Sequence, residues 1–146
     1  MADIPTGQFY IASNMATGKV LTIDGQSTTS GAKIVIRPKD TTDNAHQLWT
    51  FNVDKKAFQS ELTPYFAIAV AGGSFASGTP IINETYTAGQ VHQQWKTPYD
   101  QTIQTDSNKD YVIGLQGQQA ASGTAAVLTT RTAQPEPHCM WHFEQA

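Results

Sequence analysis

The feature that most constrains the fold of this chain is one short motif that occurs three times. Trp49, Trp95 and Trp141 stand 46 residues apart, and each follows a histidine by three positions. The three segments read His-Gln-Leu-Trp, His-Gln-Gln-Trp and His-Cys-Met-Trp. A repeat of this period is typical of a fold built from several copies of one structural unit.

Other landmarks recur in the same order within each copy. A Ser-Gly pair occurs three times, a glycine stands five residues before each of its serines, and an alternating apolar run ends two residues before that glycine. The glycines are Gly25, Gly72 and Gly117. We therefore expect one domain over residues 1–146, made of three units of about 46 residues at approximately 7–54, 55–100 and 101–146.

The sequence of each unit predicts short β-strands. Apolar runs precede the glycine turn and follow the Ser-Gly pair, and the tryptophan begins a further run. No window has the apolar spacing of a helix, so we expect almost no helical residues. The predicted strands include residues 20–23, 67–70, 112–115, 33–36, 80–83, 125–128 and 49–53. With about four strands in each unit, the chain is predicted to be an all-β protein of about twelve strands.

None of the three units can bury an apolar face alone, so we expect them to share one core around a pseudo-threefold axis. Closing the strands around that axis would also remove exposed sheet edges. The predicted core residues are Trp49, Trp95, Trp141, Leu21, Ile68, Ile113, Ile36 and Leu128.

Composition narrows the classes of function. Only 14% of the residues are charged and the net charge is −3, whereas soluble domains usually contain about 25% charged residues. This charge is too small for a protein that binds nucleic acid by neutralising phosphates. The many Thr, Gln, Ser and Asn side chains instead favour an uncharged ligand with hydroxyl groups, such as a sugar.

The location and the chemistry of the protein are constrained by what the sequence lacks. Cys139 is the single cysteine, so no disulfide forms within the chain, and residues 1–7 do not read as a secretion signal. No apolar run reaches the length of about 18 residues that a membrane span needs. We therefore expect a cytoplasmic protein that does not insert into membranes.

Neither a metal site nor a catalytic site is predicted. His138 and His142 stand four apart, but no carboxylate or thiolate cluster completes a zinc site around them. The sequence contains no nucleophile elbow, no phosphate-binding loop and no dinucleotide fingerprint. We expect no cofactor and no enzyme activity. The threefold recurrence of His46, His92 and His138 indicates a structural task, such as a hydrogen bond to a loop carbonyl.

The Gln47-x-Trp49 and Gln93-x-Trp95 elements at this period resemble the Q-x-W repeats of ricin B-type β-trefoil lectins. The resemblance covers the whole chain and is greatest to the small single-domain mushroom members, although Cys139 replaces the glutamine in the third unit. It implies a β-trefoil fold. It also implies a non-catalytic lectin that binds galactose- or N-acetylgalactosamine-type glycans at shallow sites formed by loops.

In the family that the chain resembles, three residues of a unit hold the sugar. They are an acid on the strand before the glycine turn, an aromatic residue on the next strand and an asparagine before the Q-x-W glutamine. The corresponding residues here are Thr22, Arg37 and His46 in the first unit, Ala69, Glu84 and His92 in the second, and Gly114, Thr129 and His138 in the third. This set of sugar-binding residues is therefore absent from all three units.

Two units offer substitutes. Asp24 shares a strand face with Thr22, so its carboxylate would reach a sugar hydroxyl at the strand end. The second unit offers acceptors and an aromatic ring, whereas the third has no carboxylate nearby. The predicted carbohydrate-binding residues are Asp24, Arg37, Asn44, His46 and Gln47 in the first unit and Asn83, Glu84, Tyr86 and His92 in the second.

The alternative function is protease inhibition, because mushroom β-trefoils of this size include inhibitors that insert a rigid loop into a protease. The candidate loops are residues 25–29, 39–43 and 134–137, and Lys39 and Arg131 are the nearest basic residues for a trypsin-like target. If the protein is a lectin, its partners are glycans or glycoproteins. Weak binding at each shallow site would then require several working units or a homodimer for useful avidity.

Overall fold

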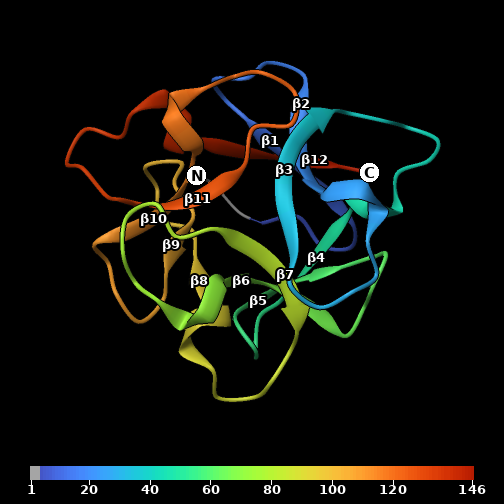
Figure 1. Ribbon diagram of the computed structural model, residues 1–146, viewed down its shortest axis with the longest axis horizontal. Helices are drawn as coiled ribbons and strands as arrows, with labels where there is room; N and C mark the ends of the chain where they lie inside the picture. The colour runs from blue at the N-terminus through green and yellow to red at the C-terminus, as the bar shows by residue number, and fades with distance from the viewer. Residues whose placement is uncertain (1–3) are drawn as a thin grey trace.

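The computed structural model describes residues 4–146 and shows an all-β fold of twelve strands (Figure 1). Residues 1–3, which begin both the predicted domain and the segment expected to carry no secretion signal, lie outside the described residues. The strands of the first unit are β1 (Phe9–Ser13), β2 (Lys19–Ile23), β3 (Ala32–Pro38) and β4 (Trp49–Asn52). Those of the second are β5 (Ala57–Ser60), β6 (Phe66–Val70), β7 (Ile81–Thr85) and β8 (Trp95–Lys96). Those of the third are β9 (Gln104–Thr105), β10 (Tyr111–Leu115), β11 (Ala126–Thr130) and β12 (Trp141–Gln145).

Helical structure within residues 4–146 is limited to six 3₁₀ turns of three residues, two in each unit. One follows the strand before the glycine, and the other carries the repeated histidine. They are η1 (Asp24–Gln26), η2 (Ala45–Gln47), η3 (Ala71–Gly73), η4 (Val91–Gln93), η5 (Gln116–Gln118) and η6 (Pro137–Cys139). In this part of the chain no helix is long and apolar enough to cross a membrane.

Three antiparallel hairpins, β2–β3, β6–β7 and β10–β11, surround the pseudo-threefold axis (Figure 1). Each has five opposed residue pairs, and short contacts between β3, β7 and β11 join the hairpins to one another. The last strand pairs with the first, because β12 lies antiparallel to β1. The predicted twelve-stranded β-trefoil is confirmed.

The shared core forms around the three tryptophans, whose side chains are at most 1% exposed. Each indole nitrogen donates a hydrogen bond to a carbonyl of the strand before the glycine turn in its own unit. The bonds are Trp49 to Leu21 at 3.3 Å, Trp95 to Ile68 at 2.8 Å and Trp141 to Ile113 at 3.0 Å. All of the predicted core residues are buried.

One core position breaks the threefold pattern. Asn83 occupies the place that Ile36 and Leu128 fill in the other units, and it is fully buried. Its side-chain nitrogen Nδ2 donates to the Thr63 hydroxyl at 3.0 Å, but its side-chain oxygen Oδ1 is buried without a partner among the described residues. A buried carbonyl that makes no hydrogen bond costs about 1–3 kcal/mol.

We expect Asn83→Leu to raise the free energy of unfolding by about 1 kcal/mol, because it removes this unpaired oxygen and adds apolar surface to the core. The Thr63 hydroxyl, which is half-buried, can bond to water instead. Urea unfolding followed by tryptophan fluorescence measures the change. Asn83→Ala is the matched control and should destabilise the protein by leaving a cavity. A loss of stability in Asn83→Leu would contradict this account.

Candidate functional site

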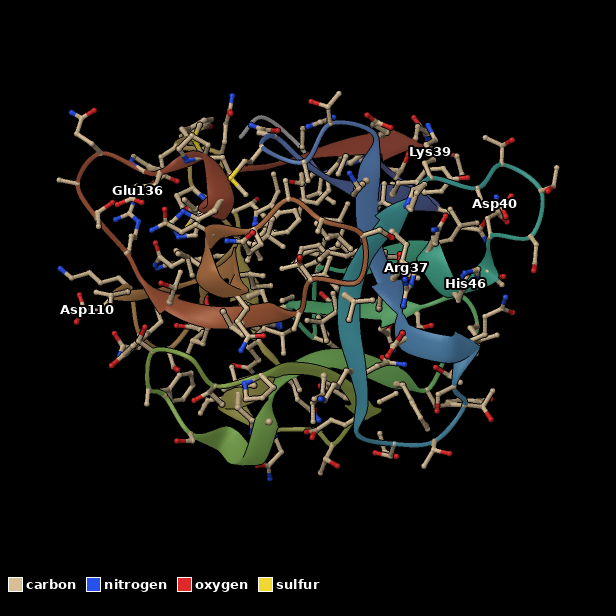
Figure 2. All side chains as sticks on the ribbon, turned by 45° about the horizontal axis from the view of Figure 1, so that its top comes forward. Arg37, Lys39, Asp40, His46, Asp110 and Glu136 are labelled. Atoms are coloured by element: carbon tan, nitrogen blue, oxygen red, sulfur yellow. The ribbon has the colours of Figure 1, made fainter. Side chains whose placement is uncertain are left out.

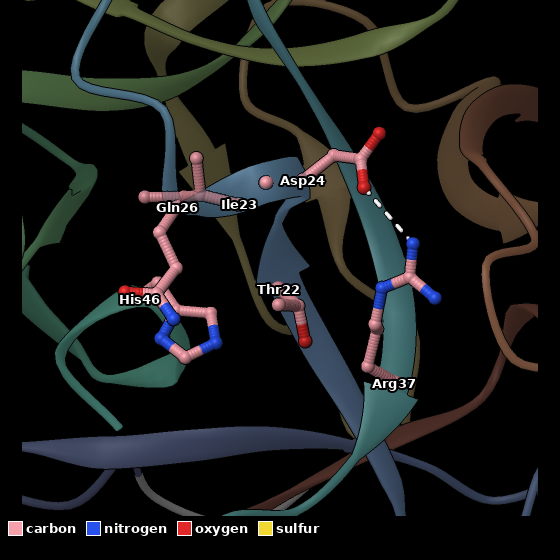
Figure 3. Close-up of a pocket in the computed structure, with 7 residues that line it drawn as sticks. Thr22, Ile23, Asp24, Gln26, Arg37 and His46 are labelled. Carbon is pink, nitrogen blue, oxygen red and sulfur yellow. Dashed lines mark hydrogen bonds and ion pairs between the residues drawn. The ribbon is translucent and has the colours of Figure 1, made fainter. Parts of the chain in front are cut away.

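A pocket of about 500 Å³ opens in the first unit, where β2 ends (Figure 3). We call it the first-unit pocket. The strands β2 and β3 and the turns η1 and η2 supply its lining residues, which are Thr22, Ile23, Asp24, Gly25, Gln26, Arg37 and His46. The chain turns sharply here because Gly25 adopts φ of 65°, a left-handed conformation that a glycine accepts without strain.

An exposed ion pair lies along one side of the pocket. Arg37 Nη2 is 3.0 Å from Asp24 Oδ1, and the two side chains are 45% and 44% exposed. The guanidinium also lies against the turn of the third unit, where a Cβ on Gly123 would stand 3.5 Å from Arg37 Nη1. Because the bond to arginine uses Oδ1, the second oxygen of Asp24 has no hydrogen-bond partner within residues 4–146 and can accept hydrogen bonds from a ligand.

The repeated histidine has a different environment in each unit. In the first unit it lines the pocket, and the buried Nδ1 of His46 has no partner among the described residues. In the second unit His92 Nε2 is 2.7 Å from Glu84 Oε2. In the third, His138 Nδ1 is 3.5 Å from Glu136 Oε2. Carboxylates in two units therefore stand where we expected a loop carbonyl.

The glutamine of the first Q-x-W element holds a loop in place beneath the pocket. Gln47 is only 1% exposed; its oxygen accepts from the Asp40 amide at 2.8 Å, and its nitrogen donates to the last carbonyl of β3 and to the Thr22 hydroxyl. Asn44 donates to the Tyr10 hydroxyl at 2.9 Å. Of the predicted first-unit residues, Asp24, Arg37 and His46 are thus brought together at the pocket. The other two hold the loop between β3 and η2.

The corresponding region of the second unit is filled by its own side chains. Glu84 Oε2 accepts hydrogen bonds at 2.7 Å from both His92 and Gln93. The histidine ring lies beside Gly73, where a Cβ would stand 3.6 Å from it. Of the predicted second-unit residues, Glu84 and His92 therefore meet, whereas Asn83 is fully buried opposite the core residue Ile68.

The corresponding region of the third unit is closed by tight packing. A Cβ on Gly114 would lie 2.8 Å from Thr129 Cγ2, 3.2 Å from Cys139 Sγ and 3.3 Å from His138 Cδ2. A smaller hollow of about 160 Å³ remains beside these residues. Glu136 lines that hollow, which corrects the expectation that this unit has no carboxylate nearby. The sequence signal was present, since Glu136 stands two residues before the repeated histidine.

The predicted inhibitor residues are held against the protein surface. Lys39 Nζ is 3.0 Å from Glu144 Oε1 and lies 4.6 Å from the centre of the Tyr10 ring, and Arg131 forms an ion pair with Asp100. In each of these two basic side chains only 33% of the surface is exposed. Neither projects freely, as a residue entering a trypsin-like specificity pocket would.

The charged groups around the first-unit pocket stand apart from those of the third unit. Figure 2 shows Arg37, His46, Lys39 and Asp40 on one side of the molecule and Glu136 on the other. Within residues 4–146 no group of three or more His, Cys, Asp or Glu side chains could hold a metal ion. Burial raises the pKa of the Cys139 thiol to about 12, so this cysteine is a poor nucleophile at neutral pH.

Comparison with known proteins supplies a family and several structural neighbours. Residues 7–141 match the family model described as a ricin-type beta-trefoil lectin domain. No curated protein sequence matches the chain. The C-terminal half of an earthworm R-type lectin, solved with N-acetylgalactosamine, has 24% identity and a TM-score of 0.80, over 97% of this chain and 100% of that one.

Two further structures have the same fold. A Macrolepiota procera ricin B-like lectin, solved with lactose, has 19% identity and a TM-score of 0.76, over 99% of this chain and 100% of that one. The designed threefold-symmetric protein ThreeFoil has 15% identity and a TM-score of 0.82, over 95% of this chain and 99% of that one. These likenesses show that the fold is shared.

We expect Gly114→Ala to lower the free energy of unfolding by about 1–3 kcal/mol, because the added methyl group would overlap Thr129 Cγ2. Thr129→Ser removes that methyl group. The double variant should therefore recover part of the loss, which a double-mutant cycle of urea unfolding measures. Equal losses in the single Gly114→Ala variant and in the double variant would show that this contact does not close the third unit.

The loop beside the first-unit pocket should loosen in acid. Hydrogen bonds from the Thr42 amide and hydroxyl and from the Asp43 amide hold the pKa of Asp40 below its usual value. The resulting stabilisation is present above the unfolded pKa of about 3.9 and is lost as the pH falls through the lower folded pKa. NMR shifts of these two amides from about pH 6 to about pH 2 should follow the titration. In Asp40→Asn the response should disappear, and an unchanged response would assign it to another group.

Proposed function

The chain belongs to the ricin-type β-trefoil lectin family, and on that premise we propose that it is a non-catalytic carbohydrate-binding protein. Its ligands are galactose- or N-acetylgalactosamine-type glycans, free or on glycoproteins, and they bind in the first-unit pocket. The observation that carries this proposal is the exposed Asp24 carboxylate, held beside Arg37 at the mouth of an open pocket. The sugars present in the earthworm and Macrolepiota complexes support the ligand class.

The chemistry of the pocket suits a neutral sugar. Sugar hydroxyls both donate and accept hydrogen bonds, and the pocket offers the free oxygen of Asp24 as an acceptor and the unused N–H groups of Arg37 as donors. The opposite charges of this pair largely cancel.

The same geometry predicts weak binding at this site. No Phe, Tyr or Trp side chain is among the described residues that line the pocket, so the sugar lacks the stacking surface that these side chains provide. A shallow polar site that orders a well-hydrated ligand gains little from apolar burial. Avidity would then come from display of the protein in more than one copy, for which a homodimer is the simplest arrangement.

The proposal predicts that Asp24→Ala abolishes glycan binding. It should change the free energy of unfolding by less than about 1 kcal/mol, because the only interaction of this side chain with the described residues is an exposed ion pair. A glycan array identifies ligands of the wild-type protein, and isothermal titration with lactose and N-acetylgalactosamine compares the variants. Asp110→Ala is the matched control, since it removes an exposed aspartate on the other side of the molecule (Figure 2).

Three outcomes distinguish sugar binding at the first-unit pocket, sugar binding elsewhere on the protein, and protease inhibition. Lost binding in Asp24→Ala with binding kept in Asp110→Ala supports the first-unit pocket. Unchanged binding in Asp24→Ala would move the site elsewhere on the protein. Absence of any glycan signal, together with sub-micromolar inhibition of trypsin, papain or pepsin in parallel assays, would overturn the lectin proposal.

A further inference from the structure

A small hollow opens between β3, β7 and β11, the three strands that meet around the pseudo-threefold axis (Figure 1). We call it the axial hollow. Three equivalent residues line it, each four positions after the serine of a Ser-Gly pair: Ile34, Ile81 and Ala126. None of the three is more than 1% exposed. The strand contacts beside them follow the same threefold pattern, since Lys33 lies opposite Ile82, Pro80 opposite Val127 and Ala125 opposite Val35.

The hollow exists because the third unit breaks this symmetry. Two units place an isoleucine at the axis, whereas the third places Ala126, which lacks the outer carbons of an isoleucine side chain. The pairings between the strands hold their backbones apart, so the neighbouring side chains cannot close the space. What remains is a volume of about 90 Å³ above an apolar floor.

The volume and the floor limit what can enter. An apolar cavity excludes water and accepts apolar groups, and benzene fits one of about 150 Å³. The axial hollow is smaller, so it suits a compact branched alkyl group such as isopropyl. A sugar ring is too large for it, and an apolar floor would leave the sugar hydroxyls without hydrogen bonds.

Two polar side chains at the rim have no partner in the described structure. Lys33 and Gln116 both line the hollow and are exposed, and neither side chain forms a hydrogen bond or ion pair within residues 4–146. Lys39 and Lys56, by contrast, are paired with carboxylates. No Asp or Glu is among the described residues that line the hollow. An unpaired ammonium and an amide N–H group therefore offer hydrogen bonds to an anion beside the apolar floor.

We propose that the axial hollow binds a short branched-chain carboxylate. The alkyl group packs on Ala126 between the two isoleucines, and the carboxylate oxygens accept hydrogen bonds from Lys33 and Gln116. An apolar floor with a few polar groups at its rim is the usual form of a small-ligand site. The hollow shares no lining residue with the first-unit pocket, so this inference does not depend on the proposed function. Because the hollow lies on the axis, one molecule binds to each chain.

The test is an NMR titration of the full chain, labelled with 13C at isoleucine and alanine methyl groups, and the probe is isobutyrate. The methyl signals of Ile34, Ile81 and Ala126 should shift together with one millimolar dissociation constant. Isobutyramide has the same shape without the charge and should bind about two- to five-fold more weakly, which is the contribution of one exposed ion pair. Acetate lacks the two outer methyl groups and should bind about ten-fold more weakly.

Three variants locate the site. Ala126→Ile fills the hollow and should abolish the isobutyrate shifts of Ile34 and Ile81. Ala126→Val adds less volume, is tolerated more easily by the core, and should weaken binding. Lys33→Gln should weaken isobutyrate about two- to five-fold and leave isobutyramide unchanged. The matched control is Lys109→Gln, because this exposed lysine lies outside the hollow and should not affect either ligand.

Each part of the proposal has a result that would overturn it. Absence of methyl shifts with isobutyrate, or equal affinity in Ala126→Val and the wild-type protein, would overturn the site. Equal affinity for isobutyrate and isobutyramide would overturn the carboxylate as the recognised group. Acetate binding as tightly as isobutyrate would assign the shifts to surface charge alone and overturn the role of the apolar floor.

Discussion

The hydrogen bond from a buried indole to a strand carbonyl is the interaction on which the rest of the structure depends. Each tryptophan fills the shared core and satisfies a backbone carbonyl of the strand that leads into the glycine turn. Removing either function would leave a cavity or an unpaired polar group beside the axis. Because this link recurs in all three units, the residues next to it are held in equivalent places, whatever chemistry they carry.

That fixed frame explains how the three units differ so much at their surfaces. Thr22, Ala69 and Gly114 are related by the pseudo-threefold axis, and all three are buried. Thr22 lines an open pocket, whereas Ala69 lies in a unit where the Glu84–His92 pair fills the corresponding space. Gly114 is covered by Thr129. Divergence has affected the side chains that surround each position and has left the hairpins unchanged. The charges of Asp24 and Arg37 therefore remain accessible beside the first-unit pocket.

Much of the fold could be predicted from the sequence because its signal is repeated. The tryptophan motif, the glycine turn and the alternating apolar run each occur three times at one period. A pattern that recurs in all three units is unlikely to be a chance match. The site was less predictable, since it depends on partners from separate loops. In the sequence, Gln47 and Asn83 look like polar residues that could bind a sugar. In the structure, the side chain of Gln47 instead makes its hydrogen bonds to the backbone of the loop after β3. Asn83 is on the core face of β7. The Glu84–His92 contact depends on the space beside Gly73, which no local pattern reveals.

The pairing of β12 with β1 closes the arrangement of strands into a ring, in which the last strand lies beside the first. Phe9 lies opposite Gln145, and the Ala146 amide donates to the Gln8 carbonyl at 3.1 Å, so the described chain ends run side by side. No unit is topologically first: a short linker across this junction, with a cut in an exposed turn between two units, would keep every strand beside its present neighbours. The fold therefore does not depend on the order of the three units along the chain, and circular permutation could place the first-unit pocket in the leading, middle or trailing third.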